Sequence, residues 1–133
     1  MANLKYLLDT NIIIYYLAGY EETFSVFDKI SKGEIEPHIS IINYIECLSF
    51  PSIKKTEKKK IENLMSLFYI HWVDEDTAFE TIKIRKKYGI KIPDAIIIAT
   101  AKLAEAVLIT RDEDMINKGI PSFLIIKKQN FSQ

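Results

Sequence analysis

The sequence predicts an α/β fold in three layers, with helices on both faces of a central, mainly parallel sheet of four to five strands. Short apolar runs alternate with longer segments whose apolar residues recur at helical spacing, which is typical of parallel sheets. Residues 95–110 are apolar nearly throughout, so we expect a helix and a strand there that are buried on most sides. At 133 residues, the chain is long enough for a single domain with a real core.

In the first half of the chain, caps and helix breakers mark the ends of the expected elements. The triplet Asp9-Thr10-Asn11 offers N-cap side chains for the first helix, and Ser40 does so for the third helix, which Pro51 ends. Gly19 and Gly33 follow the first two helices. The expected elements are a strand at 4–8, helices at 12–17 and 21–32, a weak strand at 36–40, helices at 41–49 and 54–69, and a strand at 69–73.

The second half is organised around a very apolar helix that opens on a carboxylate. Pro93 suits the first turn of this helix at 95–106, and Asp94 lies near its N-terminus, where the helix dipole favours an anion. Before it, the segment Thr77-Ala78-Phe79-Glu80 predicts a capping box that starts a helix ending at Gly89. After it we expect a strand at 107–110, a helical turn at 113–119, a last strand at 122–126 and a frayed tail from about 127.

Composition excludes several classes of function. Lys plus Arg and Asp plus Glu each total 18, so the net charge is zero and only local basic patches can attract phosphate. Cys47 is the single cysteine, which excludes an internal disulfide framework. The sequence has neither a signal-peptide apolar region nor a run of membrane-spanning length. We therefore expect a cytoplasmic protein with no membrane partner.

Acidic residues follow the strands at the positions where parallel sheets carry their sites. Asp9 directly follows the first strand, and Asp112 and Asp114 directly follow the strand at 107–110. In open α/β sheets, sites form outside the carboxyl ends of the strands. Asp94 and Glu46 are two further candidates, on the helices at 95–106 and 41–49.

Each of these acids also has a structural alternative. The aspartates can serve as helix caps. Glu46 forms a stripe with Asn43 and Ser49, since residues three apart share a helix face, and that stripe can simply be the solvent side. Four acids that one sheet edge can bring together nevertheless indicate a functional site.

Such a cluster restricts the chemistry that is possible. Carboxylates held close together repel one another unless a cation neutralises them. Oxygen ligands without cysteine or histidine suit Mg²⁺ or Mn²⁺. His38 and His71 fall outside the acidic stretches, which argues against zinc. A carboxylate-bound Mg²⁺ activates water and stabilises charge on phosphoryl oxygens, so phosphodiester hydrolysis is the natural reaction class.

Four motifs in order resemble those of PIN-domain ribonucleases, over nearly the whole of residues 1–133. They are Leu7-Leu8-Asp9-Thr10-Asn11, the Glu46 helix opened by Ser40, Ile92-Pro93-Asp94-Ala95 with Ile98-Ala99-Thr100-Ala101, and Leu108-Ile109-Thr110-Arg111-Asp112. Length and motif wording are most similar to the VapC-type toxins of toxin–antitoxin pairs. The resemblance implies a Mg²⁺- or Mn²⁺-dependent endoribonuclease that acts on single-stranded RNA. It also implies a homodimer and a cognate antitoxin that inserts into the active-site groove.

The resemblance also implies roles for individual residues. The catalytic acids are Asp9, Glu46, Asp94 and Asp112, of which Asp9, Asp94 and Asp112 bind the metal. The supporting polar residues are Thr10, Asn11, Thr110 and Asp114. The chain departs from the family pattern at Asn43, where many relatives carry Thr or Ser, and the spacing leaves open whether Asp112 or Asp114 faces the metal, although we favour Asp112.

Basic and aromatic residues supply candidates for RNA contact. Lys87 and Lys91 lead directly to the Asp94 motif, while Arg111 can contact a phosphate or pair with an acid. The run at 54–60 is either a solvated helix face or an RNA backbone contact. Four aromatic residues can stack on bases or belong to the core or an interface: Tyr15, Tyr16, Tyr44 and Trp72.

Three other functions remain open at this point. One is a non-catalytic PIN-like module that binds RNA or a partner with an idle metal site. Another is a housekeeping RNA-processing nuclease. The third is a receiver-like phosphoacceptor domain, which needs an acidic pair after the first strand, where Asp9-Thr10-Asn11 supplies only one acid.

Overall fold

The computed structural model describes residues 4–50, 54–120 and 123–125 and has a five-stranded sheet of order β3-β2-β1-β4-β5. Every pair of neighbouring strands is parallel. The predicted class, with a parallel sheet of four to five strands, is therefore confirmed. The strands are β1 (Leu4–Leu8), β2 (Ile35–Ser40), β3 (Tyr69–His71), β4 (Val107–Thr110) and β5 (Phe123–Ile125).

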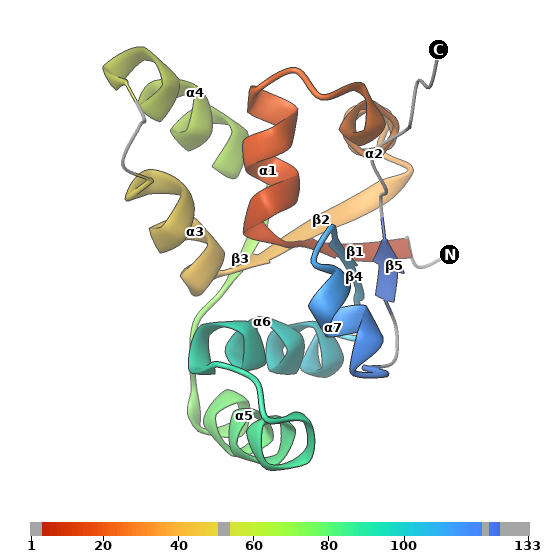
Figure 1. Ribbon diagram of the computed structural model, residues 1–133. Coiled ribbons are helices and arrows are strands. Elements are labelled where there is room, and N and C mark those ends of the chain that lie inside the picture. The colour runs from red at the N-terminus through yellow and green to blue at the C-terminus, as the bar shows by residue number, and fades with distance from the viewer. Residues whose placement is uncertain (1–3, 51–53, 121–122, 126–133) are drawn as a thin grey trace.

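Helices cover both faces of the sheet, as the three-layer prediction requires (Figure 1). Helices α1 to α4 lie on one face, and α5 and α6 lie on the other. No helix in the described part of the chain is both long enough and apolar enough to cross a membrane. The helices are α1 (Thr10–Leu17), the 3₁₀ turn η1 (Glu21–Thr23), α2 (Phe24–Ser31), α3 (Ile41–Leu48), α4 (Lys55–Met65), α5 (Glu75–Tyr88), α6 (Ile92–Leu103) and α7 (Glu113–Asn117).

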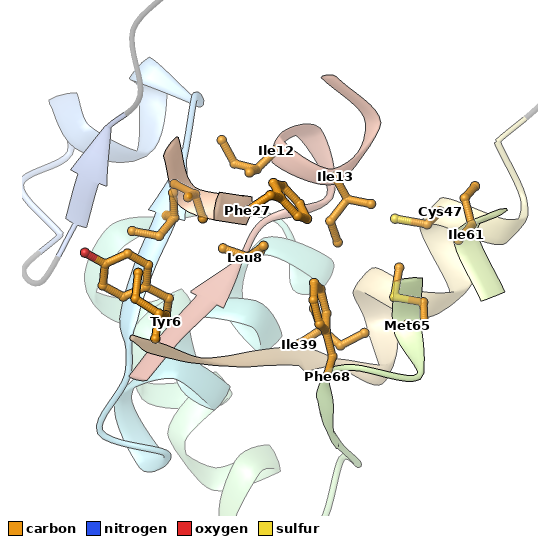
Figure 2. Packing of buried hydrophobic residues seen from close by; sticks show 13 residues of the cluster. Tyr6, Leu8, Ile12, Ile13, Phe27, Ile39, Cys47, Ile61, Met65 and Phe68 are labelled. Carbon is orange, nitrogen blue, oxygen red and sulfur yellow. The ribbon is translucent and has the colours of Figure 1, made fainter. Parts of the chain in front are cut away.

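Alternating side chains of the central strand divide the core in two. Leu8 is fully buried on the face of α1 to α4, where it packs with Ile13 and Phe27 (Figure 2). Leu7, its neighbour, is fully buried on the opposite face among residues of α6 such as Ile97. Because successive strand residues point to opposite faces, two adjacent leucines serve both cores.

The strand order creates a switch point between β1 and β4. The chain runs outward from β1 to β2 and β3, and then crosses back to β4 on the other side of β1. Ligands of open α/β sheets bind at such a point, outside the carboxyl ends of the strands. The Asp9 backbone N–H donates to the Ile109 carbonyl at 2.9 Å, so the ends of β1 and β4 are tied together there.

Several predicted helix boundaries were wrong. The buried helix predicted at 95–106 spans Ile92–Leu103, and the first helix begins at Thr10 and not at residue 12. Helix α5 begins two residues before the predicted capping box, because Asp74 is the N-cap and accepts from the Thr77 N–H at 2.9 Å. The helix predicted at 54–69 ends at Met65, where Ser66 caps it. The segment 21–32 starts as a 3₁₀ turn before α2. Pro51, Ser122, Ile126 and the tail from Lys127 lie outside the described residues.

Candidate active site

Asp9 stands at the carboxyl end of β1 and caps α1. Its Oδ1 accepts from the Thr10 N–H at 2.8 Å, and its Oδ2 accepts from Thr110 Oγ1 at 2.7 Å. The side chain is buried, and burial raises the pKa of the Asp9 carboxyl from 3.8 to about 6. The two hydrogen bonds oppose this rise, while repulsion from Asp94 and Glu46 adds to it. Asp9 is thus an anion held in a buried place by neutral donors.

Thr110 joins the ends of β1 and β4. Its hydroxyl gives its single proton to Asp9 and accepts from the Asp112 N–H at 3.0 Å and from Asn11 Nδ2 at 3.5 Å. Asn11 in turn accepts from the Arg111 N–H at 3.3 Å. Thr110 and Asn11, predicted as supporting residues, therefore connect Asp9 to the loop that carries Asp112.

Glu46 is oriented by a second threonine. Thr10 Oγ1 donates to Glu46 Oε1 at 2.7 Å and accepts from Asn43 Nδ2 at 3.1 Å. Asn43 Oδ1 accepts from the Ser40 N–H at 2.8 Å, which completes a capping box with the Ser40 hydroxyl. The Asn43 amide thereby leaves the Thr10 proton for Glu46.

The solvent-side interpretation of the stripe was wrong at Asn43, which is fully buried, whereas Glu46 is partly buried and Ser49 is exposed. Its side chain satisfies the start of α3 on one side and Thr10 on the other. In the sequence, Asn43 stood out as a member of the stripe with Glu46 and as a departure from the family pattern. The Ser40-x-x-Asn43 spacing is the signal of a capping box that would have placed it at the helix start.

Asp94 lies half-buried in the first turn of α6. Burial raises the pKa of its carboxyl above the usual range, and repulsion from Asp112 and Glu46 raises it further. Lys91 and Lys118 act in the opposite sense and lower the pKa. The four predicted acids therefore interact across one end of the sheet, although they come from four separate segments. Lys118, which the sequence did not single out, lies close enough to act on Asp94.

Asp112, and not Asp114, is among the groups that raise the pKa of Asp94. Asp112 acts on the Asp94 carboxyl, and its Oδ1 caps α7 by accepting from the Asp114 N–H at 3.0 Å. Asp114 is exposed and is not among the groups that shift the pKa of Asp94 or Asp9. The choice of Asp112 as the residue that faces the metal stays a prediction.

The remaining potential metal ligands are used elsewhere. His38 is buried, and its ring nitrogens lie 2.7 Å from His71 Nε2 and 2.7 Å from Glu36 Oε1. Burial raises the pKa of the Cys47 thiol to about 12, so this thiol is inert packing at neutral pH. Within residues 4–50, 54–120 and 123–125, no three His, Cys, Asp or Glu side chains are arranged so as to hold a metal ion.

The candidate RNA contacts have different surroundings. Arg111 was predicted to contact a phosphate or to pair with an acid. In the structure it pairs with an acid, because its Nη1 lies 3.2 Å from Glu22 Oε1. Lys87 is exposed and lies over the Tyr88 ring, with Nζ 5.3 Å from the ring centroid. Lys91 precedes α6 and acts on the Asp94 carboxyl.

Of the four aromatic candidates for base stacking, three are engaged in packing. Tyr16 stacks on Phe27 at 3.7 Å between ring centroids, and Tyr44, a residue of α3, packs against the core. Tyr15 lies beneath the Arg111 guanidinium. Trp72 is 71% exposed.

Fold and site together define an α/β protein with an acidic site at the switch point of a parallel sheet. The family model of the PIN domain matches residues 6–120, and the chain belongs to the PIN-domain family. PIN domains are generally nucleases that use divalent metal ions. Membership of this family excludes the receiver-like alternative. No curated protein matches the chain.

Solved structures of toxin–antitoxin systems are similar over nearly the whole chain. A toxin–antitoxin complex from Klebsiella pneumoniae shares 31% identity with a TM-score of 0.80, covering 92% of this chain and 98% of that one. VapBC2 from Rickettsia felis, bound to a promoter DNA fragment, shares 21% sequence identity with a TM-score of 0.75, and the match covers 92% of this chain and 97% of that one. VapBC-1 from nontypeable Haemophilus influenzae shares 24% sequence identity with a TM-score of 0.70, and the match covers 92% of this chain and 98% of that one. The predicted resemblance to VapC-type PIN domains is confirmed.

Proposed function

We propose that the protein is a metal-dependent endoribonuclease that hydrolyses RNA phosphodiester bonds and acts as the toxin of a VapBC-type pair. One observation carries this proposal: a PIN-domain chain gathers acids from four segments at the switch point of its sheet. Among the described residues, Asp9 and Glu46 each accept a hydrogen bond from a threonine hydroxyl. Hydrogen bonds that orient carboxylates in this way are typical of catalytic sites.

The donor set fits Mg²⁺ or Mn²⁺, because every candidate ligand is a carboxylate oxygen. We propose Asp9, Asp94 and Asp112 as the ligands. Without a cation these carboxylates repel one another, and this repulsion adds to burial, the larger cause, in raising the pKa values of Asp9 and Asp94. Among the described residues no three acids are arranged so as to hold an ion, so binding requires them to draw together. When bound, the ion polarises water and offsets charge on the phosphoryl oxygens.

The protein's own groups then have distinct tasks. Thr110 fixes the Asp9 carboxylate, and the same hydroxyl holds the Asp112 backbone. Glu46, with one oxygen occupied by Thr10, has its other oxygen available to orient the attacking water and accept its proton. Attack of this water on phosphorus forms the new P–O bond as the bond to the 3′-oxygen breaks, and the 3′-oxygen takes up a proton from solvent and leaves as a hydroxyl.

The RNA strand is proposed to approach over the start of α6. Lys91 lies near enough to Asp94 to lower its pKa, and the exposed Lys87 lies before it in the chain, near the end of α5. Cations there would attract a phosphate backbone in a salt-dependent way. Arg111 is left out of this surface because Glu22 already pairs with it.

A cognate antitoxin and a second copy of the chain are the proposed protein partners. The similar solved structures from Klebsiella pneumoniae, Rickettsia felis and Haemophilus influenzae are complexes of toxin with antitoxin. Residues 67–73 expose four large apolar side chains around β3, which supports an interface there: Leu67, Tyr69, Trp72 and Val73. A small antitoxin-like reading frame beside this one would favour the toxin over a housekeeping nuclease.

The test compares cleavage of a mixed single-stranded RNA pool by wild type and Asp94→Asn, with Mg²⁺, Mn²⁺ or EDTA. The matched control is Asp28→Asn, which changes an exposed aspartate paired with Lys32 on α2. We expect metal-dependent cleavage by wild type and by the control. We expect none by an Asp94→Asn protein whose circular dichroism spectrum equals that of wild type. Full activity of a folded Asp94→Asn protein would refute the site. If wild type neither cleaves RNA nor binds Mn²⁺ in a calorimetric titration, the non-catalytic module is the better account.

A further inference from the structure

Arg111 adjoins Asp112 in sequence, but its side chain packs against α1 and η1. The guanidinium carbon lies 4.0 Å from the centroid of the Tyr15 ring and 5.8 Å from that of Tyr20. Its Nη1 lies 3.2 Å from Glu22 Oε1, and the Arg111 and Glu22 side chains are only 14% and 9% exposed. A planar cation enclosed by a carboxylate and an aromatic face has few other orientations to adopt.

The backbone around Arg111 is fixed at the same time. The Arg111 N–H donates to Asn11 Oδ1 at 3.3 Å, and the Asp112 N–H donates to Thr110 Oγ1 at 3.0 Å. The turn between β4 and α7 is therefore held by two backbone bonds and by one anchored side chain. Asp112 is the next residue of this turn, so its direction depends on these three restraints.

The charge of Arg111 is directed to Glu22 and not to the acidic site. Among the described residues, the charged groups that shift the pKa of Asp94 are two acids and two lysines, and Arg111 is not one of them. Nor is it among the groups that act on Asp9. The contacts of Arg111 with Tyr15, Glu22 and Asn11 thus favour an influence on the site through the position of the turn.

We propose that Arg111 is a positioning residue: clamped by Glu22 and Tyr15, it fixes the turn that presents Asp112 to the acidic site. This inference rests on the proposed function, because the position of Asp112 matters only if the acidic site binds a metal ion. It differs from a phosphate contact, because a guanidinium that is largely buried and paired with Glu22 is withheld from RNA. It also assigns a role to Glu22, which no sequence motif singled out.

The test uses Arg111→Met, which removes the charge and the planar group, and Arg111→Lys, which keeps the charge alone. Hydrogen exchange of the Asp112 amide is measured by NMR on the metal-free proteins, and Mn²⁺ affinity is measured by calorimetry. Lys102→Met is the matched control, since it removes an ion pair with Glu80 at 2.6 Å on the α5–α6 side. We expect faster exchange at Asp112 and roughly 10- to 100-fold weaker Mn²⁺ binding for Arg111→Met, as for other residues that orient ligands. Arg111→Lys should recover part of both, and the control should change neither.

A second comparison separates positioning from a general loss of structure. If Arg111 acts through Asp112, adding Arg111→Met to Asp112→Asn should weaken Mn²⁺ binding no further. Additive losses would overturn the proposal, as would unchanged exchange and affinity in Arg111→Met. A rise in KM for RNA with unchanged Mn²⁺ affinity would also overturn it in favour of a phosphate contact.

Two further outcomes need their own tests: an Arg111→Met protein that does not fold, and a wild type without nuclease activity or Mn²⁺ binding. If Arg111→Met does not fold, Glu22→Gln carries the test, because it keeps the size of the side chain and removes only the charge that holds Arg111. If wild type neither cleaves RNA nor binds Mn²⁺, the proposed function fails. Hydrogen exchange at the Asp112 amide then tests by itself whether Arg111 holds the turn. Unchanged protection of this amide in Arg111→Met and Glu22→Gln overturns the proposal.

Discussion

Replacing Asp9 by asparagine should stabilise the metal-free protein while it abolishes cleavage. The Asp9 carboxyl is 6% exposed, and its pKa rises from 3.8 to about 6 on folding. By proton linkage this shift means that the buried charge costs about 3 kcal/mol of stability near pH 8. Asparagine removes the charge but also gives up one of two accepted hydrogen bonds, from Thr10 or Thr110, at a loss of about 1 kcal/mol. The expected net gain is about 2 kcal/mol.

The sign of the pH dependence follows from the same shift. Between pH 3.8 and about 6 the folded protein binds more protons at Asp9 than the unfolded chain does, so wild type recovers stability as the pH falls. Near pH 5 the cost of the Asp9 carboxyl is about 1.6 kcal/mol, and the advantage of Asp9→Asn should shrink by about 1.4 kcal/mol relative to pH 8.

Urea denaturation in EDTA, at steps from pH 8 to pH 5, measures this difference. Asp28→Asn again serves as the control and should show a small difference from wild type with no trend around pH 6. Mn²⁺ should stabilise wild type and leave Asp9→Asn unchanged, since a ligand stabilises only the state that binds it. A destabilised Asp9→Asn protein whose deficit is the same at every pH would refute the account of Asp9 as a costly buried anion.

Three further predictions concern the groups around the acids and the two histidines. Thr110→Val should raise the pKa of Asp9 further and weaken Mn²⁺ binding roughly 10- to 100-fold in calorimetry. Asn43→Ala should lower the free energy of unfolding by about 1–3 kcal/mol in urea titrations, because a buried backbone N–H loses its acceptor. His71→Gln should flatten the loss of stability below pH 6.5: burial, then His38 and Lys5, lower the pKa of His71, so the folded protein resists a proton that the unfolded chain accepts. An equally steep acid loss in His71→Gln would contradict that last assignment.

Elements that depend on local pattern were predictable from the sequence. The strand at 107–110 and the buried helix before it follow from an apolar run and from Pro93 and Asp94 in the first turn. The start of α5 was missed because Thr77 and Asp74 both have N-cap chemistry. Only the extended backbone of Asp74 shows which of them caps the helix. Local chemistry therefore predicts that a helix begins, and tertiary structure selects the residue.

The site was predictable as a set of acids but not as a set of bonds. Asp9 and Asp112 follow strands, and a parallel sheet brings strand ends together whatever the details of packing. The bond from Thr10 to Glu46 joins residues 36 apart in sequence, and it depends on how α1 and α3 cross. Neither periodicity nor spacing contains that crossing, so the sequence alone left the orientation of Glu46 open.

The acids are held by groups that leave their charge intact. Asp9 receives its bonds from a backbone N–H and from Thr110, and Glu46 receives one from Thr10. A lysine or arginine in these places would cancel the charge that a divalent cation must meet. Arg111, the cation nearest to the β4 turn in sequence, is instead neutralised by Glu22. The arrangement thus separates two tasks: hydroxyls and backbone N–H groups orient Asp9 and Glu46 without neutralising them, and the arginine of the turn, paired with Glu22, serves to hold the turn in place.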